Sequence, residues 1–134
     1  MSWVDLVIHS KGIKAIYGDH TPSLTGIDLH KVVFDYDRIH VTLVFDLPEL
    51  PATLPAKWQK RECDVVQIEM DLIEISDLSA RVWGSRTSTS IHMVESQGKL
   101  NVSVQSETGE LSATADFASL QRISAYRSDV KRHR

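Results

Sequence analysis

The sequence contains one cysteine, four prolines and six glycines among its 134 residues. The lone Cys63 cannot form an intrachain disulfide, so nothing indicates an exported, disulfide-stabilised scaffold. No apolar run approaches the roughly 18 residues of a membrane-spanning helix, and the N-terminus lacks the features of a signal peptide. We therefore expect a cytoplasmic protein with a single α+β domain over residues 1–128 and a frayed basic tail over residues 129–134.

Sequence signatures of common enzymes are also missing. The chain has no phosphate-binding loop, dinucleotide fingerprint, CxxC pair, HExxH motif or GxSxG motif. The nearest approach to a metal-ligand cluster is the group formed by Asp35, Asp37 and His40. A hairpin would place Asp35 opposite His40 on the solvent side, which favours an ordinary surface pair beside a turn. We expect no enzymatic activity, no cofactor and no metal.

The charge balance is acidic once the end of the chain is separated from the body. Fifteen basic and eighteen acidic side chains give a net charge of −3. Because residues 129–134 carry a net +2, residues 1–128 carry −5. An acidic body repels phosphate backbones, so we expect no nucleic-acid or membrane partner.

The hydrophobic pattern predicts short helices within the first seventeen residues, ended by Gly18, and strands thereafter. A hairpin turning at residues 37–38 would pair Phe34 with Val41 and Val32 with Leu43, which places both apolar sets on one face. The pattern breaks near Leu72, which indicates a bulge. The expected fold is α+β, with a mainly antiparallel, curved β-sheet of seven to eight strands and short N-terminal helices.

Turn signals divide the last third of the chain into three strands. With turns centred on residues 97–98 and 108–109, Ile91 would face Val104, Met93 would face Val102, and Val102 would also face Ala115. The three strands would then share one buried apolar face. That face comprises Leu100, Val102, Val104, Ala113, Ala115 and Phe117.

An acidic stretch from Glu62 to Asp77 contains six acids and no base. Within it, Gln67, Glu69 and Asp71 would form an outward row on one strand, because side chains two residues apart share a face. The row is explained either as a polar face that keeps the sheet soluble or as a surface for a basic protein partner. Three further residues could extend such a binding surface: Asp46, Glu49 and Trp58.

Several short segments together resemble the immunity protein 50 family of bacterial polymorphic toxin systems. They are Ser2-Trp3, Pro22-Ser23-Leu24, Phe45-Asp46-Leu47-Pro48, Pro55-Ala56-Lys57-Trp58, Ala115-Asp116-Phe117 and Ile123-Ser124-Ala125-Tyr126. The resemblance extends over about the whole chain, and the proline-rich loop before Lys57-Trp58 is its most specific part. It implies a small cytoplasmic protein that binds and blocks a cognate toxin without enzymatic activity.

These observations lead to two functional hypotheses. The first is a toxin-neutralising immunity protein that binds a cognate protein toxin stoichiometrically, with the acidic row meeting a basic surface. The alternative is a small-molecule-binding protein or small hydrolase that uses the concave side of the sheet. The oligomeric state stays open at this stage.

Overall fold

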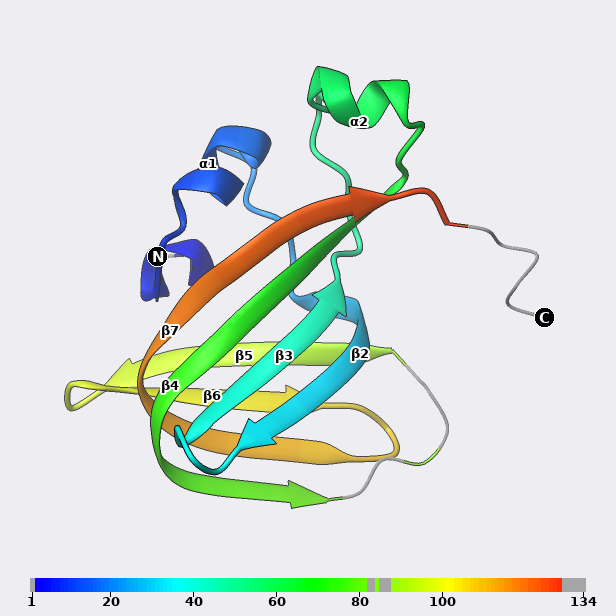
Figure 1. The fold of residues 1–134 in the computed structure, drawn as a ribbon. Coiled ribbons are helices and arrows are strands. Elements are labelled where there is room, and N and C mark those ends of the chain that lie inside the picture. The colour runs from blue at the N-terminus through cyan, green and yellow to red at the C-terminus, as the bar shows by residue number, and fades with distance from the viewer. Residues whose placement is uncertain (1, 82–83, 85–87, 129–134) are drawn as a thin grey trace.

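A computed structural model describes residues 2–81, 84 and 88–128, so the predicted tail over 129–134 lies outside the described residues. The chain forms a strongly curved sheet with short helices at one end (Figure 1). The elements are η1 (Trp3–Leu6), β1 (Val7–Ile8), α1 (Lys11–Tyr17), β2 (Thr25–Asp35), β3 (His40–Asp46), α2 (Ala56–Lys60), β4 (Val65–Arg81), β5 (Thr89–Ser96), β6 (Lys99–Gln105) and β7 (Glu110–Tyr126). Among these described helices, none is long and apolar enough to cross a membrane.

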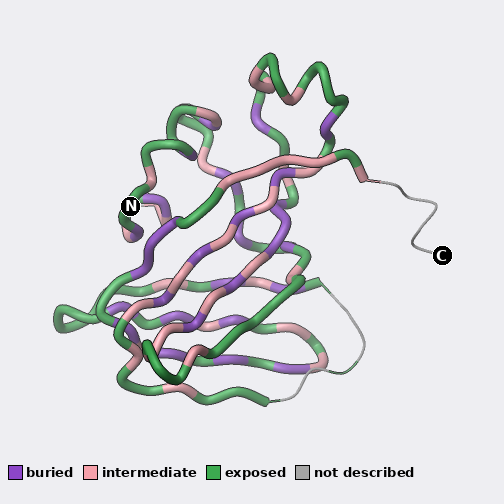
Figure 2. Tube along the Cα trace, viewed as in Figure 1, coloured by how far each residue is buried: buried purple, intermediate pink, exposed green. Residues whose placement is uncertain are grey.

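The seven strands follow the order β1-β7-β4-β3-β2-β5-β6, and β6 also pairs with β7. All pairings are antiparallel except that of β1 with β7, so the sheet is mixed and the mainly antiparallel, curved sheet expected from the sequence is confirmed in its general form. The sheet is not closed as a barrel, because the described part of β5 meets β2 only at Thr25 and Ile27. Buried residues alternate with intermediate or exposed ones along β4 and β6 (Figure 2), and the buried side chains belong to one core cluster.

The N-terminal segment confirms the predicted short helices. The Asp5 carboxylate accepts a hydrogen bond from the Ser2 backbone N–H at 3.3 Å, which secures the first turn. Helix α1 ends at Gly18, whose φ of 62° suits a residue without a side chain. The Trp3 indole donates to the Pro22 carbonyl at 2.8 Å and so ties this segment to the following loop.

The β2–β3 hairpin has the predicted register between Val32 and Asp35. Phe34 lies opposite Val41, Val32 opposite Leu43, and Asp35 opposite His40. Of these pairs only Val41 and Leu43 of β3 are buried, because in the described structure the second half of β2 has no strand on its other side, and Val32 and Phe34 remain exposed.

The C-terminal strands confirm one predicted register and correct another. Strands β5 and β6 pair as expected, with Ile91 opposite Val104 and Met93 opposite Val102. Strand β7 is shifted by two residues, so that Val102 faces Ala113 instead of Ala115. A shift of two preserves the face, and five of the six predicted core residues are buried. Phe117 is the exception, at 37% exposed.

Strands β4 and β7 are unusually long. Each runs for 17 residues, and the described sheet has seven strands, the lower of the two numbers expected. The irregularity expected near Leu72 lies slightly later, where Glu74 has a φ of 60° and the pairing with β7 shifts between Ile75 and Asp77. These irregularities bend both strands together, and Phe117 leaves the core at this bend.

Candidate functional site

The outer face of the central strands carries the predicted polar row. Along β4, Gln67, Glu69 and Asp71 alternate with the buried side chains of Val66, Ile68, Met70 and Leu72. The predicted outward direction of these three residues is therefore confirmed. All three are only partly exposed, because β3 and β7 flank β4 on both sides. We call these three residues the acidic row.

The neighbouring strands supply partners for the row that the linear sequence does not reveal. The Thr42 hydroxyl of β3 donates to the Asp71 carboxylate at 2.6 Å. On the other side, Arg122 of β7 stands opposite Glu69 in the strand register. The stretch from Glu62 to Asp77 contains no base, but the fold places the cationic Arg122 beside it.

Asp46, at the end of β3, is a buried carboxylate rather than an extension of an exposed patch. It is 7% exposed. Its Oδ1 accepts a hydrogen bond from the Gln67 side-chain amide at 3.0 Å, and its Oδ2 accepts one from the Tyr126 hydroxyl. His30 Nε2 lies 2.7 Å from the same Oδ2. Several polar partners are what a buried carboxylate requires, and the bond to Gln67 holds one residue of the acidic row in place.

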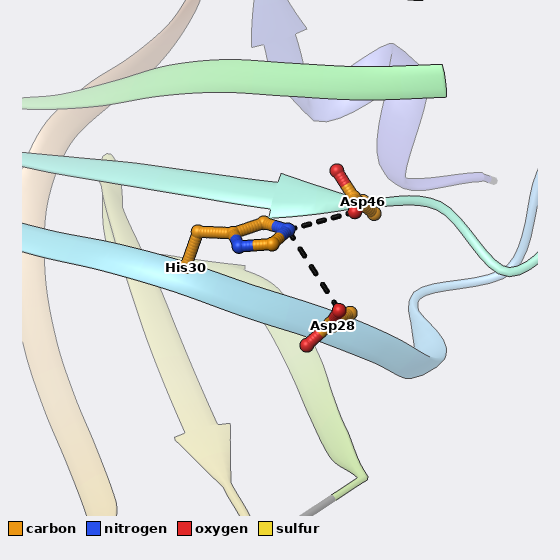
Figure 3. A group of neighbouring side chains, drawn as sticks. All are labelled: Asp28, His30 and Asp46. Carbon is orange, nitrogen blue, oxygen red and sulfur yellow. Dashed lines mark hydrogen bonds and ion pairs between the residues drawn. The ribbon is translucent and has the colours of Figure 1, made fainter. Parts of the chain in front are cut away.

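A bulge in β2 brings Asp28 and His30 to Asp46 (Figure 3). The register shifts between Leu29 and Lys31, so the extra residue His30 turns toward Asp46 while Asp28 stands directly opposite it. Asp28 Oδ2 lies 3.7 Å from His30 Nε2. One ligand atom from each residue falls within 4.8 Å of the others.

Two carboxylates and an imidazole are chemically suited to a divalent cation. In this arrangement, however, both oxygens of Asp46 already accept hydrogen bonds from protein groups. The geometry therefore describes a hydrogen-bonded cluster that joins β2, β3, β4 and β7. This cluster was not predicted from the sequence, although Asp28 and His30 stand two residues apart along one strand.

Glu49 connects the start of the proline-rich loop to the N-terminal segment. Its carboxylate accepts a hydrogen bond from the Ser23 backbone N–H at 2.8 Å and lies 3.3 Å from His20 Nε2. The Ser23 hydrogen bond, followed by that of His20, lowers the pKa of Glu49. The Tyr17 hydroxyl donates to the Glu49 backbone carbonyl at 2.7 Å, and burial followed by the nearby Glu49 charge raises the pKa of Tyr17.

Trp58 lies on α2 and packs partly buried against the hydrophobic core. The structure thus places the six predicted contact residues in different settings. Gln67, Glu69 and Asp71 share the outer sheet face, Asp46 lies directly opposite Gln67 on β3, and Glu49 and Trp58 belong to the segments beyond the end of β3.

The concave side of the sheet holds the hydrophobic core. Inward side chains from β3, β4, β6 and β7 are buried there. These side chains occupy the space in which the alternative hypothesis would place a small molecule. A hollow of about 570 Å³ lies instead between residues 15–18 and 52–55. The described residues that line it offer the hydroxyls of Tyr17 and Thr53 but no carboxylate and no imidazole.

Comparison with known proteins connects this fold to one family. The family model described as immunity protein 50 matches residues 9–126. No curated protein and no solved structure matches the chain. The matched region begins just before α1 and ends at the last residue of β7, so it contains the acidic row and the Asp46 cluster. The chain therefore belongs to the immunity protein 50 family.

Proposed function

We propose that this protein binds a cognate protein toxin in the cytoplasm and blocks it stoichiometrically, without catalysing a reaction. The observation that carries the proposal is the match to the immunity protein 50 family over residues 9–126. An immunity protein has to leave its partner unable to reach its target, and covering the partner's functional surface achieves this without chemistry.

The acidic row is the proposed centre of the binding surface. Gln67, Glu69 and Asp71 lie on the outer face of a central strand, and residues 1–128 carry a net charge of −5. Such charge accelerates association with a basic surface and disfavours partners of the wrong sign. The partly buried setting of these side chains restricts their motion, which lowers the entropy lost on binding.

The experiment compares charge removal on the row with equal charge removal elsewhere. The double variant Glu69→Gln, Asp71→Asn removes two charges, and the introduced asparagine retains an oxygen that can accept the Thr42 hydroxyl hydrogen bond. The matched control is Glu95→Gln, Glu107→Gln, which changes two exposed residues on β5 and in the loop before β7. Each protein is titrated by calorimetry with the toxin candidate encoded beside its gene, at low and at high salt.

We expect a one-to-one complex with the unmodified protein. The row variant should lose about tenfold in affinity at low salt and less at high salt, because screening weakens the charge contribution. The control should stay within about twofold. Equal losses in both variants would reject the acidic row as the contact surface, and the absence of any complex or of protection in cells would reject the proposed function.

A further inference from the structure

The second half of β2 forms an open, apolar edge of the sheet. From Lys31 to Asp35 the strand pairs with β3 on one side. On the other side of β2, the described residues show pairing only at the start of the strand, where Thr25 and Ile27 pair with β5. Val32 is 38% exposed, and Val33 and Phe34 are each 45% exposed. Backbone groups along such an edge are available to another strand, and exposed apolar edges are the usual sites of pairing between chains.

We infer that this edge pairs with the same edge of a second copy of the protein, in an antiparallel arrangement centred on Val33. The strand sequence Lys31-Val32-Val33-Phe34-Asp35 is self-complementary in that register. Lys31 would lie opposite the partner's Asp35, Val32 opposite the partner's Phe34, and Val33 opposite the partner's Val33. Opposite charges and apolar pairs directly across two strands are both stabilising.

The observed faces of β2 agree with this arrangement. Lys31, Val33 and Asp35 lie on the outer face, opposite Val44, Thr42 and His40 of β3. Val32 and Phe34 lie on the inner face. In the proposed register, the outer face of one copy continues into the outer face of the other, with two ion pairs flanking the central valines. A register slipped by two residues would instead place Val33 against the partner's Asp35.

Neighbouring features limit the length of the pairing. The bulge at His30 interrupts the strand on one side, and the turn over residues 36–39 ends it on the other. A contact of about five residues from each copy buries less surface than the roughly 1,200–2,000 Å² that a stable protein interface buries. The dimer should therefore be weak and should depend on concentration. This inference does not rest on the proposed function, because it concerns a different strand and a different partner.

Charge reversal tests the proposed register in solution. Sedimentation equilibrium of the unmodified protein should show the mass rising with concentration from 15.1 kDa toward twice that value. Lys31→Glu and Asp35→Lys should each weaken self-association about tenfold, since each creates two like-charge pairs. An equimolar mixture of these two variants should dimerise again, because the introduced glutamate of one then faces the introduced lysine of the other. Lys60→Glu, a matched charge reversal at an exposed position of α2, should leave the association unchanged.

Cysteine cross-linking tests the position of the symmetry axis. Directly opposed strand residues have Cα atoms about 4.5–5.5 Å apart, within the range that a disulfide spans. With oxidised glutathione, Val33→Cys should therefore give a covalent dimer, whereas Val94→Cys, at another exposed strand valine, should not. The natural Cys63 is free and buried, so it should not contribute to cross-linking in either variant. A protein that remains monomeric at all concentrations, a mixture that does not recover association, or equal cross-linking of the two cysteine variants would overturn the inference.

Discussion

The Asp64 carboxylate binds the C-terminal end of the described chain. Asp64, just before β4, accepts hydrogen bonds from the Ser128 backbone N–H at 2.7 Å and from the Ser128 hydroxyl at 2.9 Å. The Asp64 N–H in turn donates to the Tyr126 carbonyl at 3.0 Å. The Ser128 backbone bond, and then its hydroxyl bond, lowers the pKa of Asp64 below its ordinary 3.8. A carboxylate with a lowered pKa favours folding while it is ionised.

The hydrogen bonds between Ser128 and the Asp64 carboxylate should therefore be lost only at acidic pH. Their contribution is fully present above pH 3.8, the ordinary pKa, and is lost as the pH falls through the lower pKa of the folded protein. A pH titration followed by NMR should move the Ser128 amide signal with a midpoint below 3.8. Asp64→Asn should abolish this transition without changing the fold. A midpoint at or above the ordinary value would contradict the assignment.

The Asp46 cluster illustrates how far sequence reasoning extends at the scale of single residues. The predicted hairpin register is correct from Val32 to Asp35, and extending it unchanged would place Leu29 opposite Asp46. The bulge at His30 shifts the pairing by one residue, so that Asp28 takes that place. The bulge reverses the phase of the apolar alternation, from Ile27 and Leu29 before it to Val32 and Phe34 after it, but the predicted hairpin began at Val32 and did not include this signal. The outward row of β4 was predictable, whereas the burial of Asp46 beside it on β3 was not.

The hairpin between β5 and β6 turns through two residues with left-handed backbone angles. Gln97 has a φ of 53° and Gly98 a φ of 78°, and Ser96 pairs directly with Lys99 across them. Two consecutive residues of this kind form the turn whose twist matches that of the flanking strands. A residue with a side chain is disfavoured at such angles, which explains why glycine stands at the second position.

Two glycine-to-alanine substitutions should therefore have opposite effects on stability. Gly98→Ala should lower the free energy of unfolding by about 1 kcal/mol, because alanine disfavours the left-handed region. Gly12→Ala should raise it by about 0.5 kcal/mol, because alanine favours helix and restricts the unfolded chain. A Cβ at position 12 would lie 3.7 Å from the Ile123 side chain, an ordinary contact. Urea unfolding measures both values, and effects of the same sign would contradict the assigned backbone angles.

At the scale of elements, turns with a clear local signature determined which pairings could be predicted. The residues Gln97-Gly98 specify a two-residue turn, and the β5–β6 register followed correctly. The next turn spans four residues, with the Ser106 side chain accepting hydrogen bonds from the Thr108 and Gly109 N–H groups. The prediction of a two-residue turn at 108–109 was therefore wrong, and the β6–β7 pairing predicted from it differs from the observed pairing by two residues. Side-chain hydrogen bonding within a loop is difficult to distinguish from a simple glycine turn by sequence alone.

The organisation of the whole sheet depends on β7, which pairs with β1, β4 and β6. The sequence predicted a curved, mainly antiparallel sheet because most strands alternate apolar and polar residues. The order of the strands could not be predicted in the same way, since partner choice is decided by contacts between residues far apart in the chain. The two-residue parallel pairing of β1 with β7 is of this kind.

All the curved strands enclose one core, so a charge placed inside it should affect the entire molecule. Val102, on β6, is 1% exposed and lies among side chains from β5 and β7, whereas Val94, on β5, is 59% exposed. Val102→Asp would bury an unpaired carboxylate at a cost of about 3–5 kcal/mol, a large part of the total stability of a domain this size. It should abolish the cooperative thermal transition seen by circular dichroism. Val94→Asp introduces the same side chain in water and should change the free energy of unfolding by less than about 0.5 kcal/mol. A folded Val102→Asp protein would show that β6 does not contribute to a shared core, and it would require a different register for the last three strands.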